Sequence, residues 1–359
     1  MPLTIRVLVV DDSALIRQML TRALSMDPRI DIVGTAKNGV EAIEKARQLS
    51  PDVITLDIEM PELTGLEALP HIRKHSDARV VMLSSLDDSD TTYRALSLGA
   101  VDFMHKPHAG MASSITELTD HLLKKIKTAY RISPDATSVA LADVDVATAP
   151  PLDASSDVAR ADNLAVAVAI AASTGGPPAL ERVFTGLSAS LPAAYLIVQH
   201  LPQGFSASLA KRLSAVGEIG VAEAVDGELL EPGRGYIAPY GAHMLVERVG
   251  SEARVVLSDS APMHGVRPAA DPLLESVARS FGTHAVCAVL TGMGSDGAQG
   301  ALAVRQAGGE VVVQDEATSV VWGMPGAVMR LGAQVRAVPV GLVAAELRRA
   351  IRSRSEGAS

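Results

Sequence analysis

Acidic side chains follow two short apolar segments near the start of the 359-residue chain. Asp11 and Asp12 come directly after segment 5–10, and Asp57 comes directly after segment 53–56. Because functional groups gather at the carboxyl ends of parallel strands, we expect these carboxylates to meet at one edge of a sheet. Oxygen ligands of this kind suit Mg²⁺, and a carboxylate beside Mg²⁺ is suited to attack a phosphoryl group, whose charge the metal neutralises.

Two further polar residues follow later apolar segments of the same region. Ser84 comes after segment 80–83, and Lys106, which precedes Pro107, comes after segment 101–104. At the same sheet edge, the hydroxyl and the ammonium would contact phosphoryl oxygens. The sequence therefore predicts a phosphoryl-binding pocket with a bound cation.

A different chemistry is indicated further along the chain, where Ser173 lies between apolar segment 164–171 and a helix expected to open at Pro177. Gly175 and Gly176 permit a tight turn, and proline is tolerated in a first helical turn. A serine hydroxyl is a weak nucleophile that needs a base, which in turn needs an orienting group. The turn thus predicts covalent acyl chemistry if those two partners are found.

Four histidines in this half are candidates for the base: His200, His243, His264 and His284. His200 follows segment 195–199 at the carboxyl edge expected for the serine, whereas His284 begins a strand and belongs to the opposite edge. Strand-end geometry therefore selects His200. Asp296 follows segment 285–290 at the same edge and is the expected orienting group. The chain order Ser, His, Asp differs from that of the α/β-hydrolases.

Alternating strand and helix patterns must position these groups. Residues 1–130 hold five such repeats, which predict a doubly wound, five-stranded parallel domain. Residues 131–163 are rich in Ala, Asp, Ser and Pro without periodicity and are expected to be an interdomain linker. Residues 164–359 resume the alternation as a second doubly wound α/β domain, with a β-hairpin inserted over residues 235–258. Its other expected strands are 166–170, 195–198, 285–290 and 310–313.

The composition argues against several classes of protein. The net charge of −9 and the absence of a Lys/Arg-dense stretch argue against a nucleic-acid partner. The single cysteine, Cys287, excludes an internal disulfide, fits a reducing compartment, and is expected to be a buried apolar side chain. No signal-peptide pattern opens the sequence, and no apolar run reaches about 18 residues. We therefore expect a soluble, cytoplasmic protein without direct membrane insertion.

The acidic pocket resembles that of the response-regulator receiver domain over about residues 4–128. The matching positions are Asp11, Asp12, Asp57 within segment 56–61, Ser84, and Lys106 with Pro107. The resemblance implies that Asp57 accepts the phosphoryl group. It also implies that Asp12, Asp57 and the backbone carbonyl of Glu59 bind Mg²⁺, that Asp11 assists through water, and that Ser84 and Phe103 are the switch residues.

The C-terminal half resembles the catalytic domain of chemotaxis protein-glutamate methylesterases. The matching stretches are 172–177, 199–202, 236–239 with His243, 290–297 and 322–325. The resemblance implies Ser173 as nucleophile, His200 as general base and Asp296 as its orienter. The backbone N–H of Met293, with Thr174, would stabilise the oxyanion. Two departures stand out, Ala171 in place of the usual glycine and the stretch 267–271, which varies the usual R-P-S-x-D.

The two resemblances together imply phosphorylation-activated hydrolysis of γ-glutamyl methyl esters, and deamidation of glutamines, on the cytoplasmic helices of methyl-accepting chemotaxis receptors. The expected phosphodonor is a chemotaxis histidine kinase. Mg²⁺ is expected in the receiver domain, and no cofactor is expected in the esterase. Because the unphosphorylated receiver is expected to block the serine edge, residues 158–359 alone should be active without a phosphodonor.

A rival interpretation comes from segment 292–297, a literal G-x-G-x-x-G between an expected strand and helix, with Asp315 after the next strand. This pattern fits a dinucleotide-binding oxidoreductase domain fused to a receiver. Against it, Asp296 lies inside the turn that would hold pyrophosphate, where a carboxylate repels an anion. It would also leave Ser173 and His200 without a role.

Overall fold

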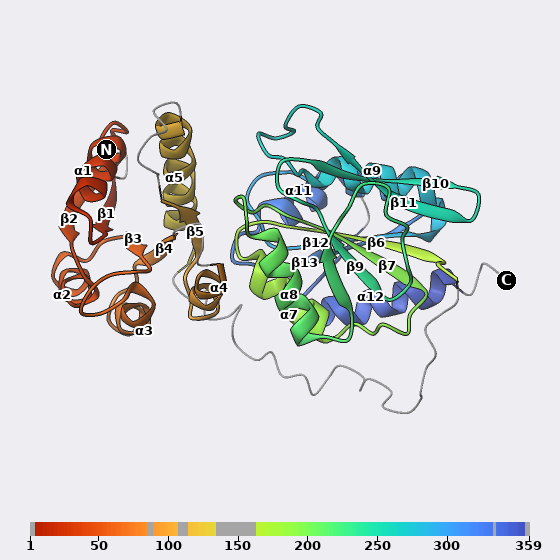
Figure 1. Ribbon diagram of the computed structural model, residues 1–359, viewed down its shortest axis with the longest axis horizontal. Helices are drawn as coiled ribbons and strands as arrows, with labels where there is room; N and C mark the ends of the chain where they lie inside the picture. Colours follow the sequence, from red (N-terminus) through yellow and green to blue (C-terminus); the bar gives the residue numbers. More distant parts are fainter. Residues whose placement is uncertain (1–3, 85–88, 107–113, 134–162, 333–334, 356–359) are drawn as a thin grey trace. The chain divides into compact units, whose positions relative to one another are not determined.

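The computed structural model describes residues 4–84, 89–106, 114–133, 163–332 and 335–355 (Figure 1). The chain divides into two compact units, Met1–Leu141 and Ala142–Ser359, and each unit has its own parallel sheet. None of the described helices combines the length and the apolar character needed to cross a membrane.

The N-terminal unit is built on a five-stranded sheet in which every strand runs parallel to its neighbours, in the order β2-β1-β3-β4-β5. Parallel neighbours require crossover connections, and a helix follows each strand. The doubly wound fold expected from the sequence is confirmed. Its elements are β1 (Ile5–Val10), α1 (Ala14–Leu24), β2 (Ile30–Ala36), α2 (Gly39–Leu49), β3 (Val53–Asp57), α3 (Gly65–His75), β4 (Arg79–Ser84), α4 (Ser89–Ser97), β5 (Asp102–His105) and α5 (Ser114–Arg131).

Side-chain caps explain why the first two helices of this unit begin where they do. The Ser13 hydroxyl accepts a hydrogen bond from the first turn of α1, and the Asn38 side chain accepts one from the first turn of α2. Each cap satisfies a backbone N–H that has no partner within its own helix. Because α1 starts four residues after β1 ends, the acidic residues lie in a short loop at the carboxyl edge.

The C-terminal unit has a seven-stranded, all-parallel sheet in the order β14-β13-β12-β6-β7-β9-β8, with a separate antiparallel pair β10-β11. Its strands are β6 (Val166–Ala172), β7 (Ala193–Gln199), β8 (Gly220–Glu223), β9 (Arg234–Ile237), β10 (His243–Val249), β11 (Glu252–Ser258), β12 (Ala285–Val289), β13 (Glu310–Gln314) and β14 (Arg336–Val338). Its helices are α7 (Gly176–Thr185), α8 (Ser206–Val216), α9 (Ala270–Phe281), the 3₁₀ turn η2 (Gly282–His284), α10 (Ala298–Gln306), α11 (Met324–Arg330) and α12 (Val340–Ser355).

The inserted hairpin is present but shorter than expected. Strand β9 pairs in parallel with β7 and β8, so it belongs to the main sheet, and the hairpin is only β10 and β11. The expectation of a hairpin over residues 235–258 was therefore wrong at its N-terminal end. Sequence pattern also missed β8 and β14, which are edge strands of four and three residues.

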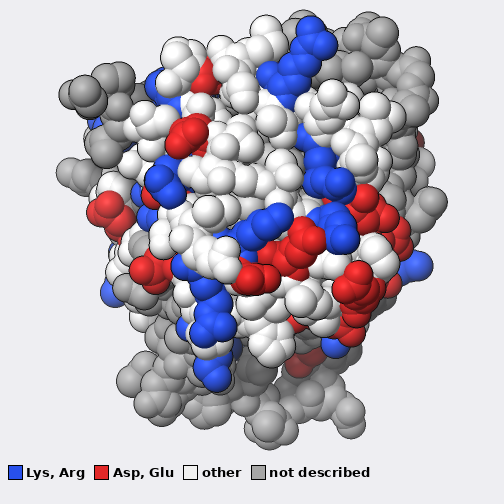
Figure 2. Space-filling model, turned by 90° about the vertical axis from the view of Figure 1, so that its left-hand side faces the viewer, with Lys and Arg blue, Asp and Glu red and all other residues white. Residues whose placement is uncertain are grey.

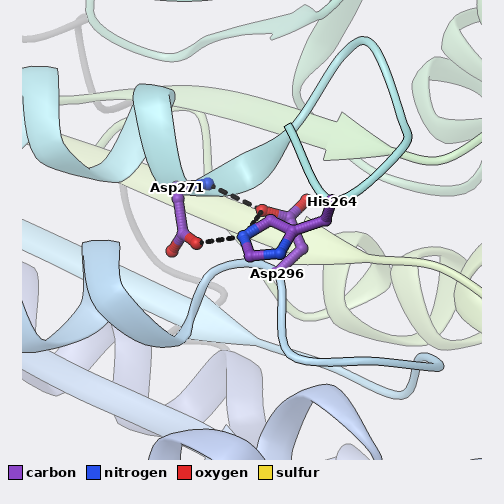
Figure 3. Close-up of side chains that lie close together, drawn as sticks. All are labelled: His264, Asp271 and Asp296. Atoms are coloured by element: carbon purple, nitrogen blue, oxygen red, sulfur yellow. Dashed lines mark hydrogen bonds and ion pairs between the residues drawn. The ribbon is translucent and has the colours of Figure 1, made fainter. Parts of the chain in front are cut away.

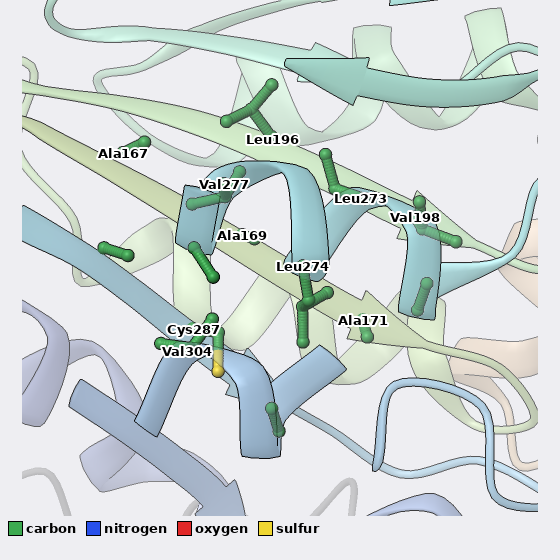
Figure 4. Packing of buried hydrophobic residues seen from close by; sticks show 14 of the residues in the cluster. Ala167, Ala169, Ala171, Leu196, Val198, Leu273, Leu274, Val277, Cys287 and Val304 are labelled. Atoms are coloured by element: carbon green, nitrogen blue, oxygen red, sulfur yellow. The ribbon is translucent and has the colours of Figure 1, made fainter. Parts of the chain in front are cut away.

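The core of the C-terminal unit depends on small side chains in its central strand. All seven residues of β6 are buried, and Ala167, Ala169 and Ala171 share one apolar cluster with Leu273 and Val277 of α9, as Figure 4 shows. Alternate residues of a strand face the same side, and methyl side chains let a helix approach the sheet closely. Helix α9 therefore packs against the central strand, which fixes its N-terminus near the carboxyl edge.

Charges of both signs are interspersed on one face of the molecule (Figure 2). On the face of the molecule that Figure 2 presents, Lys and Arg side chains of the described residues lie among Asp and Glu side chains. Interspersed charges do not create the broad field of one sign that steers highly charged partners.

Candidate active site and acidic pocket

Strand pairing places Ser173 and His200 next to each other along the carboxyl edge of the C-terminal sheet. Strands β6 and β7 are neighbours, and their last paired residues are Ala172 and Gln199. Ser173 and His200 are the next residues of the two strands, and the His200 N–H donates to the Ala172 carbonyl at 3.2 Å. The expectation that both residues leave neighbouring strands at one edge is therefore consistent with the register. Within the described residues, no hydrogen bond joins the Ser173 hydroxyl to the His200 ring.

The buried Gln199 side chain braces the turn that carries Ser173. Its Nε2 donates to the Ser173 carbonyl at 2.9 Å and to the His200 carbonyl at 3.1 Å. A Cβ atom at Gly176 would lie 1.8 Å from Gln199 Oε1, so a larger residue at the start of α7 would displace the Gln199 side chain. Sequence reasoning had not assigned a role to Gln199, although this residue belongs to the matching stretch 199–202.

His200 is paired with Asp296, as expected. His200 Nε2 lies 2.7 Å from Asp296 Oδ2, and the histidine side chain is 14% exposed whereas that of the aspartate is 3% exposed. A carboxylate can only accept, so Nε2 donates and Nδ1 is the nitrogen left to accept a proton. The pair can therefore present a neutral imidazole with a fixed tautomer to a nucleophile.

The Asp296 carboxylate is held by the N-terminus of α9. The N–H groups of Ala270 and Asp271 donate to Oδ2 at 2.7 Å and to Oδ1 at 3.0 Å. Burial alone would raise the pKa of Asp296, but the His200 ring and these two N–H groups lower it below the usual range. The ionised form is thus favoured, in agreement with a carboxylate at the positive end of a helix.

His264 and Asp271 adjoin this carboxylate (Figure 3). Sequence reasoning had considered His264 as the base without selecting it, and it had given Asp271 no role. His264 Nε2 lies 2.7 Å from Asp271 Oδ2 and 3.8 Å from Asp296 Oδ1. The available signal was the stretch 267–271, which had been noted only as a departure from a family pattern. The structure shows that this stretch supplies both N–H donors to Asp296.

The other two histidines are occupied elsewhere. His243 is buried, its Nδ1 accepts from the Ala269 N–H at 3.1 Å, and its Nε2 lies 3.2 Å from the Ala261 carbonyl oxygen. His284 lies in η2 beside Thr283. Both contacts of the His243 ring are with backbone groups of the loop that precedes α9, so His243 stabilises that loop.

The loop that carries Met293 is fixed beside Ser173. The Thr291 hydroxyl donates to the Thr174 carbonyl at 3.0 Å, and the Gln314 side chain accepts from the Thr291 N–H at 2.8 Å. A Cβ atom at Gly292 would lie 2.9 Å from Ser173 Cβ, which shows how closely the loop approaches the serine. The backbone around Met293 is therefore near the expected nucleophile.

The glycine pattern 292–297 lacks the open anion site of a dinucleotide-binding turn. The Gly300 N–H in the first turn of α10 already donates to Asp271 Oδ1 at 2.7 Å. Asp315, the expected ribose-binding acid, instead accepts from the Thr318 N–H and hydroxyl at 3.0 and 2.6 Å. The first turn of α10 therefore already binds a carboxylate where pyrophosphate would need N–H donors, and Thr318 engages the acid expected to bind ribose.

The N-terminal unit brings its expected polar residues together at the carboxyl edge. Lys106 Nζ lies 2.5 Å from Asp57 Oδ2 and 3.3 Å from Asp11 Oδ2, and both carboxylates are buried. Burial raises the pKa of Asp57 to about 7, although the Lys106 ammonium opposes the rise. The three carboxylates of this pocket, when ionised, carry more negative charge than one ammonium offsets, and a further cation would reduce their repulsion.

Donor chemistry in this pocket fits Mg²⁺. Ligand oxygens of Asp11, Asp12 and Asp57 lie within 4.8 Å of one another. The Asp11 and Asp57 Oδ2 atoms both form ion pairs with Lys106, and the buried Ser84 hydroxyl has no hydrogen bond among the described residues. Two buried carboxylates that share one ammonium can accept a further cation, and the Ser84 hydroxyl can bind a ligand. Phe103, the expected switch aromatic, is buried and packs edge-on against Tyr93. Pro107, which matched the receiver pattern beside Lys106, lies outside the described residues.

Comparisons with known proteins agree with both halves. Residues 168–347 match the family model of the CheB methylesterase, and residues 7–116 match that of the response regulator receiver domain. The chain is 41% identical to a protein-glutamate methylesterase/protein-glutamine glutaminase of Pyrococcus abyssi, covering 98% of this chain and 95% of that protein. It is 44% identical to a relative with the same activities from Xanthomonas campestris pv. campestris, covering 96% of each.

A solved structure is similar to the C-terminal unit. The crystal structure of the Thermotoga maritima CheB methylesterase catalytic domain matches with a TM-score of 0.50 and 38% sequence identity. The match covers 51% of this chain and 97% of the Thermotoga chain.

Proposed function

This chain belongs to the CheB family of protein-glutamate methylesterases and protein-glutamine glutaminases, which act in chemotaxis adaptation, and we propose that Ser173, His200 and Asp296 carry out its hydrolysis. The observation that carries this proposal is the 2.7 Å contact between His200 Nε2 and Asp296 Oδ2. It lies at the sheet edge where Ser173 follows the neighbouring strand. A nucleophile, a base and an orienting carboxylate are the three groups that acyl transfer by serine requires.

In the proposed reaction the Ser173 hydroxyl attacks the γ-carbonyl of a glutamyl methyl ester while His200 Nδ1 accepts its proton. His200 then returns the proton to the departing methoxide, and methanol leaves an acyl-serine. A water molecule, deprotonated by His200, hydrolyses this ester and regenerates the serine with release of glutamate. Glutamine follows the same steps, with ammonia as the leaving group.

Two backbone N–H groups are proposed to stabilise the tetrahedral oxyanion, those of Met293 and Thr174. The support is that both belong to segments tied to each other by the Thr291 hydroxyl, beside the serine. A preorganised pair of donors reduces the barrier because the charge on the carbonyl oxygen grows only in the transition state.

The receiver pocket is proposed to control this activity through phosphorylation of Asp57. Asp11, Asp12, Asp57 and the Glu59 backbone carbonyl would hold Mg²⁺, which offsets the charge of the phosphoryl group when bound. Lys106 would contact the phosphoryl oxygens, since its ammonium already pairs with Asp57. Ser84 and Phe103 would respond as switch residues, because the Ser84 hydroxyl is buried and unpaired within the described residues.

The partners follow from the same family membership. We propose a methyl-accepting receptor helix as the substrate and a chemotaxis histidine kinase as the phosphodonor. A substrate side chain that projects from a helix needs an accessible serine, and Ser173 and His200 are both partly exposed.

Covalent labelling tests the catalytic assignment without a receptor. A fluorophosphonate reacts with serines that a neighbouring base activates. We expect mass spectrometry to find the label on Ser173 in the full chain and to find little label in His200→Ala. Labelling of another serine, or equal labelling of His200→Ala, would contradict the assignment.

A further inference from the structure

Two carboxylates next to the proposed catalytic pair exchange hydrogen bonds between neighbouring helices. Asp296, which precedes α10, accepts from the first-turn N–H groups of Ala270 and Asp271 in α9. Asp271 in turn accepts from the Gly300 N–H in the first turn of α10 at 2.7 Å. Each carboxylate thus satisfies N–H groups that lack partners within the other helix, which locks the two helix ends together.

Close packing of the two helices reinforces this exchange. A Cβ atom at Gly300 would lie 2.5 Å from Leu274 Cβ and 2.9 Å from the Asp271 carbonyl oxygen. Glycine therefore lets α10 approach α9 until the Asp271 carboxylate reaches the Gly300 N–H. The side chain of Asp271 is 2% exposed, so these protein donors take the place of water around its carboxylate.

His264 completes the set of donors to Asp271. Its Nε2 lies 2.7 Å from Asp271 Oδ2, and since a carboxylate only accepts, the histidine donates. His264 adopts a positive φ of 55°, which is uncommon for a residue other than glycine. Paired backbone hydrogen bonds between Met263 and Val266, at 3.0 and 3.1 Å, hold the turn that carries it. The turn thus maintains an unfavourable backbone conformation that directs this ring toward the two carboxylates.

We propose that His264 and Asp271 form a second hydrogen-bonded pair that positions Asp296, and through it the His200 ring, for catalysis. His264 fixes one Asp271 oxygen and Gly300 fixes the other, so the first turn of α9 has one orientation. That turn holds both Asp296 oxygens, and Asp296 Oδ2 holds His200 Nε2. His264 and Asp271 are positioning residues, and the inference rests on the proposed role of Asp296.

His264, Asp271 and Asp296 are also residue types that can bind a divalent cation, and their ligand atoms lie close together. However, each of their four carboxylate oxygens already accepts a hydrogen bond from a defined donor. The cluster is therefore complete as a hydrogen-bonded network, which favours the positioning role. A chelator should leave the basal activity of the unphosphorylated chain unchanged. A loss that Zn²⁺ but not Mg²⁺ restores would assign the cluster to a cation and overturn the proposal.

Steady-state kinetics of full-chain variants provide the main test. We expect His264→Ala to lower kcat between about tenfold and a hundredfold with KM within about twofold, because misplacement of a catalytic group affects the chemical step. His264→Gln keeps an N–H donor and should recover most of the activity. His284→Ala, a histidine on η2, is the matched control and should behave as wild type. An unchanged kcat in His264→Ala, or a change confined to KM, would overturn the proposal.

A double-mutant comparison separates this inference from the catalytic assignment. If His264 acts through Asp296, adding His264→Ala to Asp296→Asn should cause little further loss of kcat, since the two effects are not independent. Full additivity would overturn the positioning role. If Asp296→Asn alone kept wild-type activity, the proposed catalytic function would fail instead. Fluorescence of Trp322, the single tryptophan, would report any general unfolding of the variants.

Discussion

His200 Nε2 lies 2.7 Å from Asp296 Oδ2, although the two residues follow strands β7 and β12, which flank β6 on opposite sides. The chain runs from β6 to β7 on one side and later returns to β12 on the other. The chain therefore switches direction across the central strand, and ligands of open α/β sheets bind at such switch points, beyond the carboxyl ends of the strands. Ser173 follows that central strand, so three separate segments meet at the switch point.

The first prediction concerns the histidine orientation. Asp296→Asn keeps the shape of the side chain but removes the charge that stabilises a protonated His200 ring. We expect kcat to fall by about 10³ to 10⁴. Asp315→Asn, which alters a carboxylate bound to Thr318, is the control and should change kcat by less than about twofold. A loss below tenfold in Asp296→Asn would show that the pair is not needed for catalysis.

The second prediction concerns stability and pH. Because folding lowers the pKa of Asp296, the ionised carboxylate stabilises the folded protein at every pH above the ordinary aspartate pKa of about 3.9. This contribution is lost as the pH falls through the lower pKa of the folded state. Asp296→Asn should therefore reduce the free energy of unfolding at pH 7 by about 1–3 kcal/mol, with a smaller difference below pH 4.

Urea unfolding followed by Trp322 fluorescence measures this difference in the C-terminal unit, because the indole N–H donates to the Gln314 carbonyl within that unit. A difference between wild type and variant that stays constant from pH 3 to pH 7 would contradict the linkage.

The third prediction concerns the receiver pocket. Asp57→Asn should abolish the stimulation of esterase activity by a small phosphodonor and leave the basal rate in place. Chelation of Mg²⁺ should have the same effect on the wild type, because the acidic pocket needs a cation beside the phosphoryl group. Asp31→Asn, at an exposed position on β2, is the control. Full stimulation of Asp57→Asn would place the phosphorylation elsewhere.

The fourth prediction concerns Cys287, which is fully buried in β12. Burial raises the pKa of its thiol far above the usual value, so little thiolate forms at neutral pH. We expect a thiol reagent at pH 8 to modify the folded protein very slowly and the urea-unfolded protein completely. Rapid stoichiometric labelling under native conditions would show that the core opens locally around β12.

Strand-end reasoning predicted where the residues of the candidate site lie, because parallel strands place their carboxyl ends at one edge of the sheet. Once β6, β7 and β12 are neighbours, Ser173, His200 and Asp296 follow at one edge without knowledge of any side-chain contact. The apolar runs were long enough to mark these strands. The short edge strands β8 and β14 were missed because their polar and exposed residues give no such signal.

The residues that hold Asp296 in place could not be predicted from the positions of strand ends. Asp271 and Gly300 meet where two helix ends come together, and His264 reaches Asp271 from a turn before α9. Neither the spacing nor the residue types of separate segments reveal which of these segments meet. Asp271 resembles an ordinary acidic residue of a first helical turn, where it would interact favourably with its own helix. Only the packing of α9 against α10 gives it a partner at Gly300.

Methanol release from methylated receptor cytoplasmic fragments tests the central claim most directly. Wild type, Ser173→Ala and the control Ser353→Ala, at an exposed position on α12, would each be assayed with and without a phosphodonor and Mg²⁺. We predict that wild type and Ser353→Ala release methanol, that the phosphodonor increases the rate, and that Ser173→Ala releases none under either condition. Methanol release by Ser173→Ala at the wild-type rate would contradict the account.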